Sequence, residues 1–501
     1  MITKKMGRAI SGVIVFTLIA KALGFIRELV LSYYFGATGI SDAYLISQTI
    51  PGTIFQFVGT GLTTCFIPIY YKVLNREGKE KANHFTNSIL TLVLSFSTAI
   101  ILLIWLFTPQ IVHLFAMGFT GKTLYYANWF TRIGVLSLYF STFIYVYNSY
   151  LQAHNVFMPT AFAAIPNSLI IILSIILGAY INLWILSVGS TLAVGMQLLF
   201  ILYPIWHLHF RFHFVFDWKE HNIHEFFTLL MPVVIGVSVN EINTLVDRTV
   251  ASQVAIGGIS ALTYANSLIM LVQGSIVQPI ATVCYPKITN FVSCSNEKEA
   301  KTIIQQTLDC MLAVLVPITL GFIVFANLII QALFGRGKFT WDAVQMTGIA
   351  LAFYAIGIIF IGLREILSRY YYAHSNTKVP VRNATIGVII NIIFNILFSK
   401  ILGIAGLALA TSFSACITSI LLFTGCDKYL NCGAVTIDIK ELIKIIFSSG
   451  IAILIPLFFV SKITIGNLLE LIIVITLSII IYIAIGLILR LKAFHILKKM
   501  L

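Results

Sequence analysis

Charged residues are scarce in this sequence. Only 10% of its 501 residues are Asp, Glu, Lys or Arg, and 18 are acidic, whereas 59% are hydrophobic. Because soluble domains carry about 25% charged residues, an ordinary soluble fold is excluded. The mean hydropathy of +0.97 instead places the chain among membrane proteins.

Cysteine pairs and nucleotide-binding motifs are also missing. The seven cysteines include no CxxC pair, so we expect free, packed thiols. Residues 118–123, GFTGKT, resemble the end of a phosphate-binding loop, but Ala116 stands where its first Gly belongs. Half of the ten histidines lie between His207 and His224, which we interpret as an interfacial loop. The sequence thus predicts no enzyme, no metal site and no cofactor.

Apolar runs of about 20 residues recur from end to end, as expected of membrane-spanning helices. Helices cross a bilayer because they satisfy their own backbone hydrogen bonds. The sequence therefore predicts an all-α polytopic membrane protein with about fourteen transmembrane helices. The expected spans are 10–34, 42–68, 86–108, 124–152, 158–179, 183–206, 225–252, 259–285, 305–333, 343–372, 381–400, 404–425, 441–461 and 466–489.

Basic residues concentrate in alternate loops of this arrangement. They begin with Lys4, Lys5 and Arg8 and end with Lys498 and Lys499. Because cytoplasmic loops carry such an excess, we expect both termini in the cytoplasm. The net charge of +14 is then explained by orientation and by contact with anionic lipid, rather than by nucleic acid.

Short matches at one nearly constant spacing indicate an internal repeat of six spans. The matched sets are Gly39-Ile40-Ser41 with Gly258-Ile259-Ser260, Tyr150, Ala153 and His154 with Tyr370, Ala373 and His374, and Pro68 with Pro286. Copies with an even number of spans share their orientation, so they form a parallel pseudo-twofold repeat. We expect a six-helix lobe at 1–207, a second at 223–426, and two appended helices with a basic tail at 440–501.

Ionisable residues interrupt several predicted spans. A charge at the centre of a membrane helix costs roughly 2.5–3.5 kcal/mol, so such residues usually face a protein interior or a wet cavity. We therefore select a set of candidate substrate-binding residues for a central cationic cavity. They are Lys21, Arg27, Glu28 and Asp42 near the first span; Asn240, Glu241, Asn243, Asp247 and Arg248 on one face of the seventh; and Arg364, Glu365 and Arg369 in the tenth.

Each set also has a purely structural interpretation. Lys21 and Arg27 could extend to the membrane interface, and the polar face of the seventh span could join helices. Glu365 and Arg369 stand four residues apart and could form an ion pair within one helix. A cavity lined by cations suits an anionic head group, because Arg and Lys bind phosphate oxygens through charge-assisted hydrogen bonds.

Several motifs resemble those of one known family. They are KALGFIRE at 21–28, FGA at 35–37, SDA at 41–43, INTLVDRTVAS at 242–252, and the stretches LFGRGKFT, YYYAHSNTKVPVRNA and LGIAGLALATSFSA within 333–415. In these stretches the chain resembles the MurJ family of lipid II flippases. Their wider superfamily also contains multidrug antiporters and oligosaccharide flippases.

The resemblance implies a multi-pass protein of the bacterial inner membrane that works by alternating access. Its substrate would be lipid II, the undecaprenyl-diphosphate-linked peptidoglycan precursor, moved from the inner to the outer leaflet. Arg27 matches a cation implied to hold the diphosphate, Asp42 matches an acid of the transport cycle, and Lys21 replaces an Arg. Phe55-Gln56 and Ser267 stand where many members carry Arg, and we hypothesise that Arg248 replaces the lost charge.

Two other functions share most of these features. One is a flippase for another polyprenyl-linked oligosaccharide, and the other is a cation-coupled multidrug antiporter. The cationic residues Lys21 and Arg27 and the two extra spans count against the antiporter, which resemblance associates with acidic cavities and twelve spans. Binding of cell-wall synthesis proteins stays open.

Overall fold

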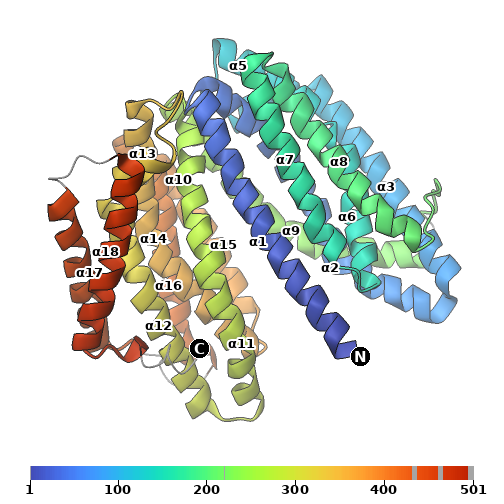
Figure 1. Cartoon of the computed structure of the whole chain (residues 1–501). Coiled ribbons are helices and arrows are strands. Elements are labelled where there is room, and N and C mark those ends of the chain that lie inside the picture. The colour runs from blue at the N-terminus through green and yellow to red at the C-terminus, as the bar shows by residue number, and fades with distance from the viewer. Residues whose placement is uncertain (1, 219, 431–436, 461–465, 495–501) are drawn as a thin grey trace. The chain divides into compact units, whose positions relative to one another are not determined.

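The computed structural model describes residues 2–218, 220–430, 437–460 and 466–494, and this part of the chain is helical without strands (Figure 1). It contains two compact units, Met1–Ser260 and Ala261–Leu501. The side chains of Lys4, Lys5 and Arg8 and the predicted basic tail with Lys498 and Lys499 lie outside the described residues.

Nine helices of the first unit are bounded as follows: α1 Ile2–Phe35, α2 Gly39–Glu77, α3 Lys79–Leu106, α4 Thr108–Phe115, α5 Gly121–Gly134, α6 Ser137–Ala153, α7 Met158–Tyr180, α8 Trp184–His207 and α9 His221–Val254. Helix α10, Gly258–Val272, begins at the end of this unit. Helix α2 packs against α5, α6 and α9, while α7 packs between α1 and α8.

The second unit continues with η1 Gln273–Val277, α11 Gln278–Ser293, α12 Glu297–Val324, α13 Ala326–Leu333, α14 Trp341–Ala373, α15 Lys378–Leu402, α16 Ile404–Leu430, α17 Ile439–Val460 and α18 Asn467–Ile488. Its core forms where α16 packs against α14 and α15. The π-helical turn η1 ends just before Pro279, whose missing N–H and bulky ring oppose regular α-helical bonding to the preceding turn.

The helical membrane fold expected from the sequence is confirmed, and a helix lies at each predicted span. Among the described residues, twelve helices are long and apolar enough to cross a membrane, or thirteen if the bent pair α5 and α6 is one span. Helix α1, whose apolar stretch is interrupted by Lys21, Arg27 and Glu28, is not among them. The predicted count of fourteen is therefore approached but not confirmed.

Contacts within the first unit indicate that α5 and α6 cross the membrane once. Their axes differ by 44°, and α5 has 14 residues, giving about 21 Å, less than the roughly 30 Å of a bilayer core. The segment after α8 hydrogen-bonds to Asn87 and Thr91, which lie in the first half of α3. Only an even number of crossings from the start of α3 to the end of α8 returns the chain to this side, so α5 and α6 together make one.

Local geometry recurs at the predicted repeat spacing. In one unit α3 breaks at Phe107 before the eight-residue α4, and in the other α12 breaks at Phe325 before the eight-residue α13. Asn155 and Ser375, which end the matched helices α6 and α14, both adopt left-handed backbone conformations, with φ of 59° and 57°. These pairs agree with a duplication.

The lobe boundaries at 207 and 223 stay a prediction about that duplication. The compact units divide later in the chain, after Ser260. Helix α9 belongs to the first unit because it packs along α2 and also contacts α3 and α4.

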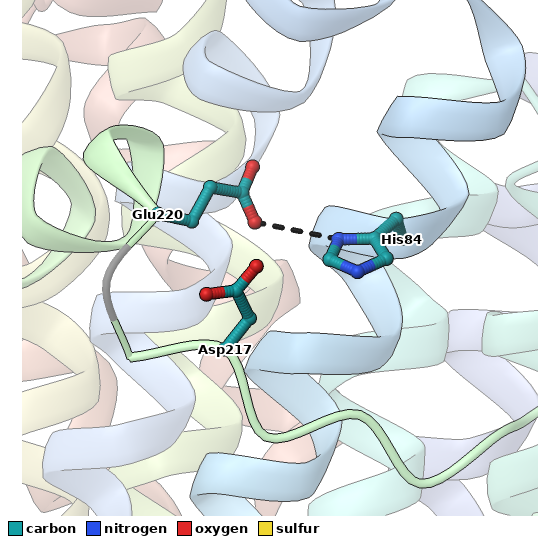
Figure 2. Close-up of side chains that lie close together, drawn as sticks. All are labelled: His84, Asp217 and Glu220. Carbon is teal, nitrogen blue, oxygen red and sulfur yellow. Dashed lines mark ion pairs between the residues drawn. The ribbon is translucent and has the colours of Figure 1, made fainter.

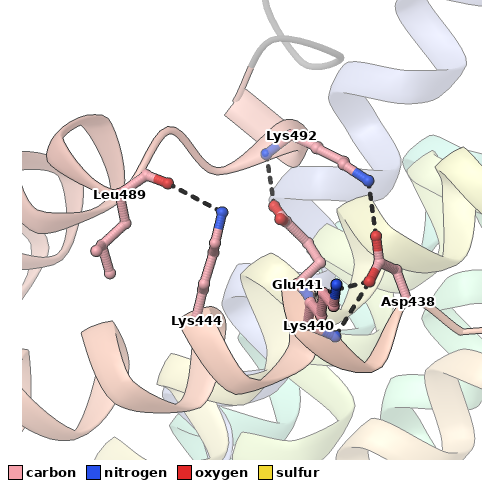
Figure 3. A network of polar contacts seen from close by, with 6 residues as sticks. All are labelled: Asp438, Lys440, Glu441, Lys444, Leu489 and Lys492. Carbon is pink, nitrogen blue, oxygen red and sulfur yellow. Dashed lines mark hydrogen bonds and ion pairs between the residues drawn. The ribbon is translucent and has the colours of Figure 1, made fainter.

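The appended helices α17 and α18 pack against each other and onto α12 and α13. A polar clasp joins the start of α17 to the chain just after α18 (Figure 3). The Lys492 Nζ lies 2.6 Å from Asp438 Oδ2, and the Lys444 Nζ donates to the carbonyl of Leu489 at 3.3 Å. The hydrogen bond from Lys492 lowers the pKa of the Asp438 carboxyl, and the same bond raises the pKa of Lys492.

Candidate functional site

Asp42 is the best-connected of the candidate residues. Its carboxylate is 1% exposed and lies in the first turn of α2. The backbone N–H of Gly257 donates to Oδ2 at 2.7 Å, and the N–H of Ser260 donates to Oδ1 at 2.8 Å. The Ser260 hydroxyl donates to the same Oδ1 at 2.5 Å. Asp42 therefore holds the turn between α9 and α10 against the start of α2.

The serines of the repeated Gly-Ile-Ser motif meet at this point. The Ser260 and Ser41 hydroxyl oxygens lie 2.9 Å apart, and Ser41 also accepts from the backbone N–H of Thr38 at 2.9 Å. Neither Ser260 nor Gly257 is among the site residues that the sequence predicts. The repeated Gly-Ile-Ser motif is the sequence signal at this point, and by itself it indicates a duplication rather than a contact.

Two glycines allow the backbones around Asp42 to approach closely. Gly257 has φ of +80°, and a Cβ there would lie 2.2 Å from the Ala37 carbonyl oxygen. A Cβ on Gly118 would lie 2.0 Å from the Ser252 carbonyl oxygen, and the Gly118 N–H donates to the Ser252 hydroxyl at 3.0 Å. Side chains at these positions would force the turns apart.

Arg27 and Glu28 form an ion pair within α1. Arg27 Nη2 lies 3.1 Å from Glu28 Oε1. Glu28 is 9% exposed, and its second oxygen is a buried atom without a hydrogen-bond partner among the described residues. Lys21, two turns earlier on α1, is exposed. The pair therefore combines a buried carboxylate with a guanidinium that is partly accessible.

The candidate residues of the seventh predicted span lie on α9. Asn240 is exposed, and Glu241 and Asn243 are half-buried. The Asn243 amide donates to Asp247 Oδ2 at 3.4 Å, while Arg248 Nη1 donates to the carbonyl of Ile259 at 3.3 Å. Arg248 thus contacts the same α9–α10 turn that Asp42 holds. Its hypothesised replacement of a lost cation stays a prediction.

In the second unit, the candidate residues of α14 divide into two sets. Arg369 bonds Glu365 Oε1 at 3.1 Å and Gln278 Oε1 at 3.2 Å, which confirms the ion pair within one helix. Arg364 instead lines a separate pocket of about 140 Å³ with Ser368 and Asn383. Neither Glu365 nor Arg369 is among the residues that line this pocket.

A family profile and several curated relatives match most of this chain. The profile of the family described as "Lipid II flippase MurJ" matches residues 31–487. The lipid II flippase MurJ of Burkholderia cenocepacia is 25% identical over 442 residues, covering 84% of each chain. A probable lipid II flippase MurJ of Vibrio cholerae is 28% identical over 435 residues, covering 83% of this chain and 82% of that protein.

Solved structures also match over nearly the whole length. A lipid II flippase MurJ in an inward closed conformation is 26% identical, with a TM-score of 0.83, and covers 95% of this chain and 98% of its own. A multidrug resistance transporter of the MATE family, 14% identical with a TM-score of 0.68, shares the fold over 84% of this chain. With the family profile spanning most of its length, this chain belongs to the MurJ family of lipid II flippases.

Proposed function

We propose that this protein moves lipid II from the inner to the outer leaflet of the bacterial inner membrane by alternating access. The observation that carries the proposal is family membership over residues 31–487. It is supported by the cations and acids inside otherwise apolar helices. Charged side chains are costly to insert into a membrane, so those that persist there usually belong to a transport pathway.

In this proposal Arg27 provides charge for the diphosphate. Its guanidinium is partly accessible and is held by the buried Glu28 carboxylate at 3.1 Å. A guanidinium suits a diphosphate because its planar N–H groups bind two oxygens at once. Lys21 lies two turns away on α1 and is exposed, so it adds a second cation on the same helix. Their placement in a central cavity stays a proposal.

Asp42 has a different proposed role, because its oxygens already accept three hydrogen bonds from protein groups. A carboxylate repels an anionic substrate, and these three hydrogen bonds also leave it no role as a direct substrate contact. We assign it instead to holding the α9–α10 turn on α2 in one state of the transport cycle. The α9 residues Asn240 and Glu241 are proposed to line the route of the head group, since both lie on the polar face.

The proposal is tested by depleting the protein in its host and measuring which polyprenyl-linked precursor is trapped on the inner leaflet. We expect lipid II to accumulate and cells to lyse. Normal lipid II with another trapped glycolipid would transfer the assignment to a different oligosaccharide flippase. No trapped lipid at all would contradict flippase activity and favour the drug antiporter.

The location and topology belong to the same proposal. We infer a cell-membrane protein with both termini in the cytoplasm, because the basic loops alternate with weakly charged ones. Enzymes of cell-wall synthesis are natural partners for a flippase of this substrate, and co-purification from crosslinked membranes would test such binding.

A further inference from the structure

Three ligand-forming side chains from separate parts of the first unit converge beside the early turns of α3 (Figure 2). His84 lies on α3, Asp217 lies in the segment after α8, and Glu220 is the N-cap residue of α9. One side-chain nitrogen or oxygen from each residue lies within 4.8 Å of the other two. Figure 2 shows the imidazole and both carboxylates facing a common space.

Two of the atoms that face this space form a long ion pair with each other and no hydrogen bond among the described residues. His84 Nδ1 and Glu220 Oε2 are 3.5 Å apart, and both are buried atoms without a hydrogen bond among the described residues. Buried polar atoms in folded proteins nearly always have a partner. With the Asp217 carboxylate beside this ion pair, the three residues offer one ligand atom each to a cation in the common space.

The surrounding contacts hold the three groups in position. The Asn222 amide donates to Glu220 Oε1 at 3.2 Å, which leaves Oε2 directed toward His84. On α3, the Asn87 side chain accepts from the His213 N–H at 3.1 Å, and the Thr91 hydroxyl accepts from the Val215 N–H at 3.1 Å.

His84, Asn87 and Thr91 recur at helical spacing and so share one face of α3. That face anchors the segment that brings Asp217 and Glu220 to His84. Such supporting hydrogen bonds are typical of metal sites, where outer groups orient the ligands.

The donor set suits a divalent cation of the zinc class. Tetrahedral zinc with bonds of about 2.0–2.1 Å separates its ligand atoms by about 3.3 Å, close to the 3.5 Å between His84 Nδ1 and Glu220 Oε2. Two carboxylates balance the charge of a divalent ion. An imidazole ligand favours zinc and similar metals over magnesium or calcium, which prefer oxygen alone.

We propose that His84, Asp217 and Glu220 form a binding site for one zinc-class divalent cation, which joins α3 to the start of α9. The three protein ligands leave one tetrahedral position for water. The cation constrains the segment between α8 and α9 at the end of the helix that carries the polar face. This site is independent of the proposed flippase activity.

The test is zinc binding by the full-length protein, purified in detergent without a polyhistidine tag and stripped with a chelator. Calorimetric titration should give one zinc ion per chain. His84→Gln, Asp217→Asn and Glu220→Gln should each weaken the affinity at least about tenfold, because each removes one of three ligands. The matched controls His224→Gln and Glu80→Gln change nearby residues outside the cluster and should bind as the native protein does.

Cobalt provides a readout that needs no variant. Co²⁺ bound to the native protein should give the strong visible absorption of a tetrahedral site, and zinc should displace it. Absence of saturable binding, or equal weakening in the controls, would overturn the proposal. It would also be overturned if His84→Gln lowered the melting temperature while zinc had no effect on the native protein, since the cluster would then be only an ion pair.

Discussion

At the scale of single residues, variants of Arg27 and Glu28 distinguish a role of Arg27 in transport from a role in stabilising the fold. Arg27→Gln leaves the buried Glu28 carboxylate without its recorded ion partner, which we expect to destabilise the protein by about 1–3 kcal/mol. Replacing both residues by Gln removes the uncompensated charge and should recover most of that loss. Both variants should nevertheless fail to relieve lipid II accumulation in depleted cells.

The controls are the single variant Glu28→Gln, which keeps the cation, and thermal unfolding of each purified protein. We expect Glu28→Gln to retain substantial transport. Normal flipping by the double variant would show that Arg27 acts only as the partner of Glu28, and the substrate-binding assignment would be wrong.

Ser260 supports a second prediction at this scale. Ser260→Ala removes a 2.5 Å hydrogen bond to the buried Asp42 carboxylate but keeps the backbone donor of the same residue. Hydrogen bonds to charged groups contribute about 1.5–3 kcal/mol, so the melting temperature should fall by several degrees. Ser267→Ala is the matched control, because that hydroxyl donates to the carbonyl of Tyr264 within its own helix. Equal effects of the two changes would contradict the role given to Asp42.

At the scale of elements, the clasp of α17 and α18 predicts a defined pH window. The pKa of Asp438 is lowered, so its contribution exists above the ordinary value of about 3.9 and is lost as pH falls through the lowered value. The pKa of Lys492 is raised, so its contribution exists below about 10.4 and is lost as pH rises through the raised value. The clasp should therefore persist unchanged from about pH 5 to pH 9.

Hydrogen exchange of the first turn of α17, corrected for the intrinsic rate, measures this directly. Protection should stay flat across the window and fall as the pH drops below the ordinary carboxyl value of about 3.9 and through the lowered pKa of Asp438. Lys492→Met should reduce protection at pH 7, whereas Lys400→Met, at the exposed end of α15, should not. A loss of protection between pH 5 and pH 9 in the native protein would show that other groups control this end of the hairpin.

The positions of the helices were largely predictable from the sequence, because the length of an apolar run indicates a membrane-spanning helix whatever that helix packs against. The bend between α5 and α6 and the break at Phe107 were not, since both interrupt otherwise continuous apolar runs. The partners of Asp42 were equally hidden, because Gly257 and Ser260 are more than 200 residues away in the chain. His84 was also not predictable as a member of the cluster. The sequence concentrates histidines between 207 and 224, whereas the imidazole beside Asp217 and Glu220 comes from α3.

At the scale of the whole molecule, the number of membrane crossings and the distribution of basic loops together predict on which side of the membrane each loop lies. If α5 and α6 cross once and both termini are cytoplasmic, Lys122 and Arg336 lie outside, while His209 and Cys294 lie inside. All four positions are exposed in the structure. In a chain whose other cysteines are replaced, we expect Lys122→Cys and Arg336→Cys to react with a membrane-impermeant maleimide on spheroplasts. His209→Cys and the native Cys294 should react only after permeabilisation.

Labelling at position 209 distinguishes a single membrane crossing by α5 and α6 from two separate crossings. Two separate crossings by α5 and α6 would place it on the opposite side from the start of α3, so that His209→Cys and Lys79→Cys would differ in their labelling. The hydrogen bonds from His213 and Val215 to α3 require the two positions to behave alike. If both label only after permeabilisation, the orientation expected from the basic loops is correct. If both label on spheroplasts, the single crossing stands, and the inside and outside of the membrane must be exchanged for this part of the chain.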